Sequence, residues 1–296
     1  MWKASVMAVA LVGMMGTVMA DTSDFEAEIA QHRAERVNSL TRPLGWLSLV
    51  GMHWIEPGRH SLGRAADNDI VLAVGPEHLG WVTLADGQVR LEPAAAASFL
   101  VDGTPGQGGV ELIPDTRPGT TYITFDAGHS GFNLIERDHR FALRVRDAQA
   151  QTRTGFKGLD YYPADPGWRI QARFERHPEG TTIPIANVIN QLEDTPNPGA
   201  VVFERDGTTY RLEGLIDDDG SLFLVFADRT SGKATYGGGR MLNAPFPDGD
   251  EVVLDFNLAY NPPCAFNDYS TCPLPPPENR LSLAVTAGEK SYRRSN

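Results

Sequence analysis

Apolar and polar positions follow a helical pattern near the N-terminus. The segment SDFEAEIAQHRAERVNSL, residues 23–40, repeats apolar residues at near-helical spacing, at Phe25, Ile29, Val37 and Leu40. Ser23 or Asp24 can cap the start of such a helix, and Pro43 ends it. The pattern therefore predicts one helix, which we expect to pack on a sheet.

From residue 45 onward, short apolar runs alternate with turn residues. Segments such as WVTLADGQVRLEP and TTYRLEGLI alternate apolar and polar positions with a period of two, as half-buried strands do. Asp86-Gly87 and Asp102-Gly103 are typical hairpin turns between such segments. The chain is therefore predicted to be all-β, mainly an antiparallel sandwich or barrel, with one N-terminal α-helix.

The same pattern divides the chain into four parts. We expect a signal peptide over 1–20, the helix and a linker over 21–45, a sandwich-like unit over 46–127, and a barrel or sandwich over 128–296. The boundary between the two β units is a soft one, between about 128 and 155. Glycine, proline and aromatic residues gather in 152–167, which is the candidate linker.

The first twenty residues, MWKASVMAVALVGMMGTVMA, have the composition of a secretory leader. Lys3 precedes an apolar run, and small residues precede Asp21. The run is shorter than the roughly 20 residues needed to span a bilayer. We therefore expect cleavage after Ala20, a periplasmic or secreted protein, and no transmembrane segment in the mature chain.

Composition and charge restrict the class of partner. With 41% hydrophobic and 22% charged residues, the chain is ordinary globular material, and its formal net charge is −12. Such a surface repels phosphate backbones and anionic lipid. Nucleic acid is therefore excluded as a partner, which leaves a small molecule or an envelope protein.

Familiar metal and nucleophile motifs are incomplete. None of the seven histidines forms a His-x-x-x-His pair, and His177-Pro178-Glu179 lacks the Cys-x-x-Cys segment of zinc deaminases. The run Gly128–Phe132 is similar to a nucleophile elbow, but it lacks the second glycine and the helix that follows. We expect no metal site and no cofactor.

Residues 61–72, SLGRAADNDIVL, resemble the start of a forkhead-associated domain. The pair Gly63-Arg64 and the run Asn68–Leu72 match two parts of the phosphothreonine site of that family. The Ser-Arg-x-x-His segment of the family is absent, since residues 76–80 read PEHLG. The resemblance therefore implies a β-sandwich without its phosphopeptide recognition group.

One stretch concentrates unusual chemistry: NPPCAFNDYSTCPLPPPENRL, residues 261–281. It holds both cysteines of the chain and six prolines, which remove backbone donors and stiffen the segment. In an exported protein, Cys264 and Cys272 are most simply a disulfide. A working thiol pair or part of a metal site remains open.

A stiff loop presents side chains at low entropic cost. The turn Tyr236–Arg240 contains three glycines, so a ligand can approach its backbone closely. The candidate ligand-binding residues are those that the loop, its flanks and this turn offer: Tyr236, Arg240, Asn257, Tyr260, Asn261, Glu278, Asn279 and Arg280.

The same residues resemble a known family. Residues 255–266, DFNLAYNPPCAF, with 271–281 and AGEK at 287–290, closely resemble the hallmark of domain-of-unknown-function family 1684. Residues 45–47, 68–70 and 232–240 fit it too. The resemblance implies no activity, since none is established for that family.

Two main hypotheses follow, from different classes. The first is a binding module for a small anionic or hydrogen-bonding ligand, sited at the Pro/Cys loop. The second is a hydrolase-type enzyme, with Glu278 or Glu289 as acid or base and Arg240 or Arg280 stabilising negative charge. A structural or protein-interaction domain of the envelope is the third possibility. Convergence of the candidate residues in one pocket would separate a site from a structural role.

Overall fold

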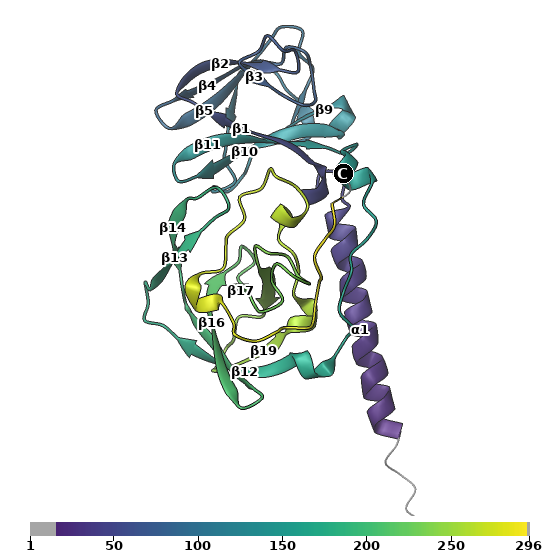
Figure 1. Cartoon of the computed structure of the whole chain (residues 1–296). Helices are drawn as coiled ribbons and strands as arrows, with labels where there is room; N and C mark the ends of the chain where they lie inside the picture. The colour runs from purple at the N-terminus through teal and green to yellow at the C-terminus, as the bar shows by residue number, and fades with distance from the viewer. Residues whose placement is uncertain (1–15, 295–296) are drawn as a thin grey trace, which may run out of the picture.

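The computed structural model describes residues 16–294, with side chains from residue 23 onward. Figure 1 shows two β units stacked end to end, with one long helix running alongside the second. The predicted leader, residues 1–20, lies mainly outside the described residues. In the part of the chain that is described, no helix is both long and apolar enough to cross a membrane.

The N-terminal unit is a sandwich of two sheets. One sheet has the order β3-β2-β4-β5-β8 and the other β1-β11-β10-β9-β6-β7. Its strands are β1 (Leu49–Ile55), β2 (Gly58–Gly63), β3 (Ile70–Val71), β4 (Gly80–Ala85), β5 (Gln88–Pro93), β6 (Leu100–Val101), β7 (Thr104–Pro105), β8 (Val110–Leu112), β9 (Tyr122–Phe125), β10 (Ser130–Arg137) and β11 (Arg140–Asp147). Alternate residues of both sheets, such as Val82, Leu91, Phe132 and Leu143, form the core between them.

The C-terminal unit is a six-stranded sheet, β18-β17-β16-β15-β12-β19, curved into a half-barrel. Its strands are β12 (Arg169–Arg176), β15 (Gly199–Arg205), β16 (Thr208–Ile216), β17 (Leu222–Phe226), β18 (Arg240–Ala244) and β19 (Glu251–Asp255). A separate ribbon joins β13 (Thr182–Ala186) to β14 (Leu192–Pro196). Aromatic side chains fill the half-barrel, with Phe256 packed against Trp168, Phe203 and Phe226.

Helix α1 (Gly16–Leu40) packs along the C-terminal unit. Its buried face carries Phe25, Ile29 and Leu40, as the spacing predicts. The helix does not begin at Ser23 or Asp24, because the preceding residues continue the same helical backbone from Gly16. Short helical turns occur elsewhere: η1 (Trp46–Ser48), η2 (Asp126–Gly128), α2 (Gln151–Thr154), η3 (Pro166–Trp168), η4 (Phe256–Leu258), η5 (Pro263–Ala265) and η6 (Pro277–Asn279).

The hairpin turns follow the predicted chemistry. Asp86-Gly87 joins β4 to β5 with φ of 52° and 71°, and Asp102-Gly103 joins β6 to β7 with 49° and 81°. Positive φ at both central residues matches the twist of the flanking strands, and aspartate and glycine tolerate it. The all-β prediction with one N-terminal helix is confirmed.

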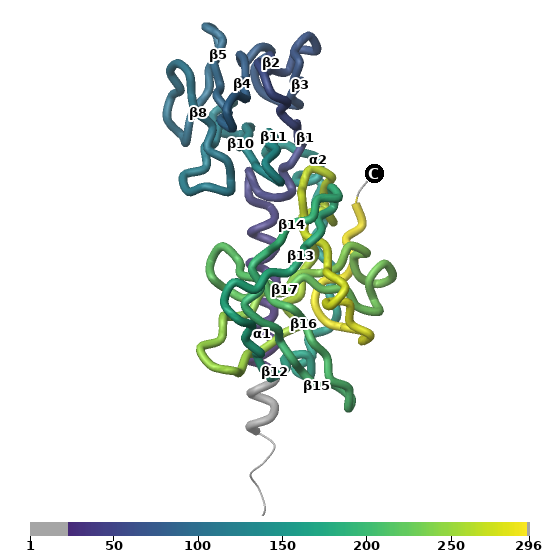
Figure 2. The backbone as a smooth tube through the Cα atoms, turned by 90° about the vertical axis from the view of Figure 1, so that its left-hand side faces the viewer, coloured from purple at the N-terminus to yellow at the C-terminus, as the bar shows by residue number. Residues whose placement is uncertain are grey.

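The boundary expected at residue 128 falls inside a sheet. Strand β9 ends at Phe125 and pairs with β10, which pairs with β11, and β11 pairs with β1. Strands 130–137 and 140–147 therefore belong with the N-terminal sheet, because their hydrogen bonds and core contacts lie there. We propose that the division between the units lies within 148–168, close to the candidate linker (Figure 2).

Candidate functional site

The two cysteines are joined. Cys264 and Cys272 lie at disulfide distance, with Cα atoms 6.2 Å apart, and both are buried. They close an irregular loop that docks on the N-terminal unit, where Asn267 Nδ2 donates to the carbonyl oxygen of Trp46 at 3.1 Å. The predicted pairing is confirmed, and the thiol-pair and metal-ligand alternatives do not describe this structure.

Arg240 stabilises the fold. Arg240 lies in β18 and is 1% exposed. Its Nη2 donates to Asp228 Oδ2 at 2.7 Å and to the carbonyl oxygen of Val285 at 2.9 Å. Its Nη1 donates to the carbonyl oxygen of Ala287. The guanidinium therefore fastens the C-terminal segment to the half-barrel, and its charge is paired with that of buried Asp228.

Three candidate asparagines are buried and bonded to backbone. Asn257 exchanges two hydrogen bonds of 2.9 Å with the backbone of Asp165. Asn279 Oδ1 accepts from the amide of Glu213 at 2.6 Å, and its Nδ2 donates to two carbonyl oxygens at 2.9 Å. Asn261 Nδ2 donates to the carbonyl oxygen of Lys290 at 2.8 Å. Asn257 and Asn261 therefore satisfy irregular backbone, and Asn279 satisfies peptide groups of β16 and β17.

Glu289 is committed to the N-terminal helix. It is 1% exposed, its Oε1 accepts from Arg36 Nε at 2.9 Å, and its Oε2 accepts from the amide of Asn261 at 2.8 Å. Arg36 Nη2 also donates to the carbonyl oxygen of Asn261 at 2.8 Å. Both oxygens of Glu289 hold the fold, so the geometry gives an acid or base role no support.

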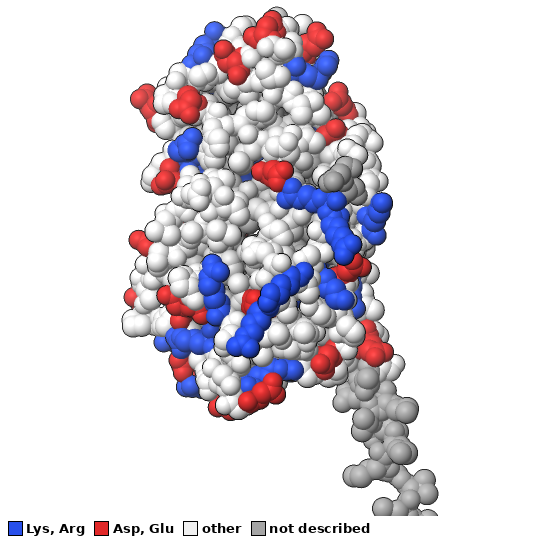
Figure 3. Space-filling model, viewed as in Figure 1, with Lys and Arg blue, Asp and Glu red and all other residues white. Residues whose placement is uncertain are grey.

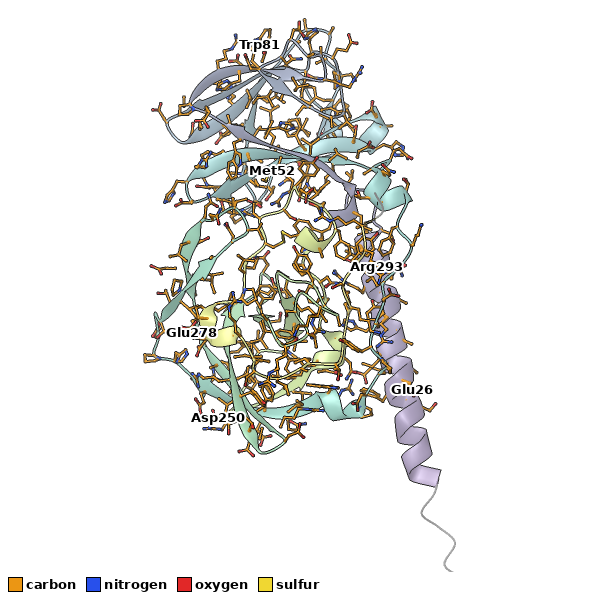
Figure 4. The ribbon with its side chains drawn as sticks, in the orientation of Figure 1. Glu26, Met52, Trp81, Asp250, Glu278 and Arg293 are labelled. Carbon is orange, nitrogen blue, oxygen red and sulfur yellow. A yellow bond between two sulfur atoms is a disulfide. The ribbon has the colours of Figure 1, made fainter. Side chains whose placement is uncertain are left out.

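Glu278 and Arg280 are not part of these buried contacts. Both are exposed, and Glu278 lies on the side of the C-terminal unit away from α1 (Figure 4). Arg280 Nη2 makes one long contact, 3.4 Å, to the carbonyl oxygen of Pro275. The structure therefore does not bring the eight candidate residues into one pocket.

Tyr236 and Tyr260 pack near the disulfide. Burial raises the pKa of both, to about 12 for Tyr260. The Tyr260 hydroxyl donates to Asn243 Oδ1 at 2.7 Å, and the guanidinium of Arg36 lies 4.7 Å above its ring. Of the eight candidates, Tyr260 lines the cavity described next.

A cavity of about 380 Å³ lies where the two units and α1 meet. The N-terminal unit contributes Trp46, Arg137 and Arg144, and α1 contributes Arg36. The opposite walls come from the C-terminal unit, including Asp217 and Met241, and from the disulfide loop over residues 270–273. Figure 4 places Met52, which pairs with Arg144 across β1 and β11, at this junction between the units.

Arginines gather on the sheet face that borders the cavity. Arg144 and Arg146 alternate along β11, and Arg137 lies on the neighbouring β10. Arg137 binds both oxygens of Asp115 at 2.8 Å, while Arg144 Nη1 lies 3.8 Å from the same carboxylate. Thr271 Oγ1 of the loop accepts from Arg137 Nε at 3.0 Å and from Arg144 Nη2 at 3.3 Å.

The charges in this group, Arg137, Arg144, Arg146 and Asp115, do not balance. Arg144 is 3% exposed, and its Nε has no hydrogen-bond partner among the described residues. Burial, then repulsion from Arg137, lowers the pKa of Arg144 to about 10, and burial lowers the pKa of Arg146. Arg137 and Arg144 therefore share one carboxylate, while Arg146 donates to the neutral Asn133 and forms no ion pair with a described residue, in a chain whose net charge is −12. Side chains of both signs are visible on the face shown in Figure 3.

Arg36, Arg137, Arg144 and Asp217 were not among the residues expected from the sequence. The available signal was RFALRVRD at 140–147, where arginines alternate with Phe141, Leu143 and Val145. One face of that strand is apolar core, so the other carries arginines toward whatever covers it. The partner that covers it, the disulfide loop, follows more than 120 residues later.

A second cavity, of about 230 Å³, lies beside Asn267, Tyr269 and the chain end. Its arginine, Arg294, already donates to Asp268 Oδ1 at 2.6 Å and to the carbonyl oxygen of Cys264 at 2.6 Å. The second cavity therefore presents less unpaired positive charge to a ligand than the first. Across the described side chains, no three or more His, Cys, Asp or Glu residues group as a metal site.

Comparison with known proteins places the C-terminal unit in a family. The model of the family "Protein of unknown function (DUF1684)" matches residues 154–290, so residues 45–47 and 68–70 lie outside the match. An uncharacterized protein of Haloarcula marismortui, solved by solution NMR, is 37% identical over 47% of this chain and 78% of that one, with a TM-score of 0.39. No curated protein matches, and the likeness to a forkhead-associated domain is not confirmed. The chain belongs to the DUF1684 family.

Proposed function

We propose that this protein is a binding module, and that the cavity between its units holds a small anionic ligand. One observation carries the proposal: of three guanidiniums on one sheet face, Arg137 and Arg144 share a single carboxylate and Arg146 has none in ion-pair distance, and the most buried of them, Arg144, lines an open cavity. The disulfide loop forms part of the cavity wall, so the proposed site still borders the Pro/Cys loop. Most of the residues that line this site differ from the eight candidates expected from the sequence.

The energetics favour an anion at this position. A buried charge without a full counter-charge is costly, and removing a partner from a buried pair costs about 3–5 kcal/mol. Arginine offers planar donors that match carboxylate and phosphate oxygens. An anion beside Arg144 would supply the missing charge and accept from donors that the protein leaves open.

A purely structural role for these arginines does not explain their excess positive charge. Thr271 and Asp115 bind the arginines and so join the loop to the N-terminal unit. Such a junction needs hydrogen bonds, but it does not need excess positive charge. A neutral donor in place of Arg144 would serve it at lower desolvation cost.

The same proposal includes the place of action. We infer that the protein works outside the cytoplasm, in the periplasm or medium, after removal of the leader. The leader pattern of residues 1–20 and the disulfide support this, because disulfides persist in oxidising compartments.

The test is a thermal-shift screen at constant ionic strength. Phosphate, citrate, benzoate and 3-phenylpropionate are compared with the neutral 3-phenylpropionamide, using wild type, Arg144→Gln and Arg140→Gln. Arg140 is the matched control, because it lies on the same strand but is exposed, at the surface beside Glu56. At least one anion should raise the melting temperature of wild type and Arg140→Gln but not of Arg144→Gln. Equal shifts in all three proteins, or none with any anion, would overturn the proposal.

A further inference from the structure

The wall of the cavity opposite the arginines carries an acid that lacks a cation. Asp217 lines the cavity from the turn after β16, and it forms no ion pair with any described residue. Its Oδ2 accepts from Asn243 Nδ2 at 2.6 Å, and its Oδ1 from the amide of Asp218 at 2.9 Å. The carboxylate is held in place but is not neutralised.

A hydrogen-bond chain fixes the direction of this carboxylate. The Tyr260 hydroxyl donates to Asn243 Oδ1, so the amide nitrogen of Asn243 faces Asp217. Each carboxylate oxygen has two lone-pair directions, and each receives one donor here. One acceptor position on each oxygen therefore has no donor among the described residues.

The rest of the lining combines apolar side chains with polar ones, the polar residues being Arg36, Ser39, Tyr260, Ser270 and Thr271. Phe223 and Met241 come from the half-barrel, and Pro263, Cys272 and Pro273 come from the disulfide loop. A volume of about 380 Å³ lies near the lower end of the 300–1,000 Å³ that is typical of small-molecule sites. The space suits a compact molecule with an apolar body rather than the end of a polymer.

We propose that the cavity selects a zwitterion, a short apolar peptide whose carboxylate meets Arg137 and Arg144 and whose ammonium meets Asp217. The proposal rests on the anion site proposed above and adds the second charge. The two charged walls belong to different units, so a molecule with its charges at opposite ends of an apolar body spans them. A simple carboxylate would satisfy one wall and leave Asp217 unpaired.

The experiment uses three peptides with the same body. Leu-Leu keeps both charges, N-acetyl-Leu-Leu lacks the ammonium, and Leu-Leu-amide lacks the carboxylate. Calorimetry with the wild-type protein should show Leu-Leu binding at least tenfold more tightly than either derivative. Asp217→Asn should reduce Leu-Leu to the affinity of N-acetyl-Leu-Leu, whose own affinity should not change. Asp218→Asn, an exposed neighbour on the same turn, is the matched control and should bind as wild type.

The outcomes separate the two proposals. Equal affinity of the wild type for Leu-Leu and N-acetyl-Leu-Leu would overturn the zwitterion inference and leave the anion site standing. Loss of Leu-Leu binding in Asp218→Asn as well as Asp217→Asn would also overturn it, since the effect would not belong to one carboxylate. Failure of every anion in the thermal-shift screen would overturn both. The wild-type comparison needs no variant, so a misfolded Asp217→Asn does not remove the test.

Discussion

The guanidinium of Arg144 lies 3.8 Å from the carboxylate of Asp115, and that carboxylate is already bound by another cation. Arg137 binds both of its oxygens at 2.8 Å, so Arg144 receives only part of one negative charge. Burial and the neighbouring Arg137 lower the pKa of Arg144 to about 10, yet a group with that pKa is still protonated at neutral pH. The wall of the cavity therefore keeps a positive charge that the described residues do not balance.

Arg240 should prove essential for stability. Arg240→Ala removes the partner of buried Asp228 and leaves the carbonyl oxygens of Val285 and Ala287 unbonded. Losing one member of a buried pair costs about 3–5 kcal/mol, so urea unfolding should show a loss of that order. Arg280→Ala, on an exposed arginine, should change the free energy of unfolding by less than about 0.5 kcal/mol. Similar losses in both variants would contradict this assignment.

The disulfide should contribute both stability and binding. Replacing Cys264 and Cys272 by alanine removes a short loop closure, worth about 2.5 kcal/mol in the chain-entropy model. Ligand affinity should fall as well, because Cys272 lines the cavity and Thr271 beside it binds two arginines. Urea titration and calorimetry check the two effects. Unchanged anion affinity in a folded double variant would show that the loop does not shape the site.

Acid should destabilise the protein through Glu213. Burial alone raises the pKa of this carboxyl, but hydrogen bonds from His177, Asn197 and Arg211 outweigh it and hold the pKa below its ordinary value of 4.5. A depressed folded pKa gives stability that is present above the unfolded pKa and is lost as pH falls through the folded one. Melting temperature should therefore drop below about pH 4.5, and more in wild type than in Glu213→Gln. Parallel curves for the two proteins would reject the role of Glu213.

Alkaline pH should destabilise the protein through ionisation of Tyr260. Burial raises its pKa to about 12, so the folded protein keeps the phenol neutral while the unfolded chain ionises it near 10. A raised folded pKa gives stability that is full below the unfolded pKa and is lost as pH rises toward the folded one. Wild type should lose melting temperature between pH 10 and about 12, and Tyr260→Phe should lose less. Absorbance titration at alkaline pH should show one late-titrating tyrosine fewer in the variant.

Much of the fold could be predicted from local patterns. Asp-Gly turns, alternating strands and the helical spacing of Phe25, Ile29 and Leu40 are set by neighbours in sequence, and the structure confirms them. The boundary between the units was not predictable in this way. Strand β10 begins only five residues after Phe125, and it pairs with β11, which in turn pairs with β1 at residues 49–55, far away in the sequence.

The candidate site was likewise only partly predictable from local sequence patterns. The polar residues of the loop and its flanks looked available in the sequence, but most of them bond buried peptide groups of other segments, because buried peptide groups need hydrogen-bond partners. Asn257 and Asn279 are examples. The charged wall of the cavity combines α1, β10 and β11, and no linear spacing connects Arg36 to Arg144.

The central claim is that Arg144 is kept charged for an anion and not for the fold. The most direct measurement is calorimetric unfolding of wild type and Arg144→Met, with and without the anion that gives the largest shift in the screen. Without anion, Arg144→Met should melt at the same temperature as wild type or about 2–5 °C higher, because an incompletely paired buried charge has been removed. With anion, wild type should gain melting temperature and the variant should not. A variant that melts several degrees lower without anion, yet shows the same gain with it, would contradict the account.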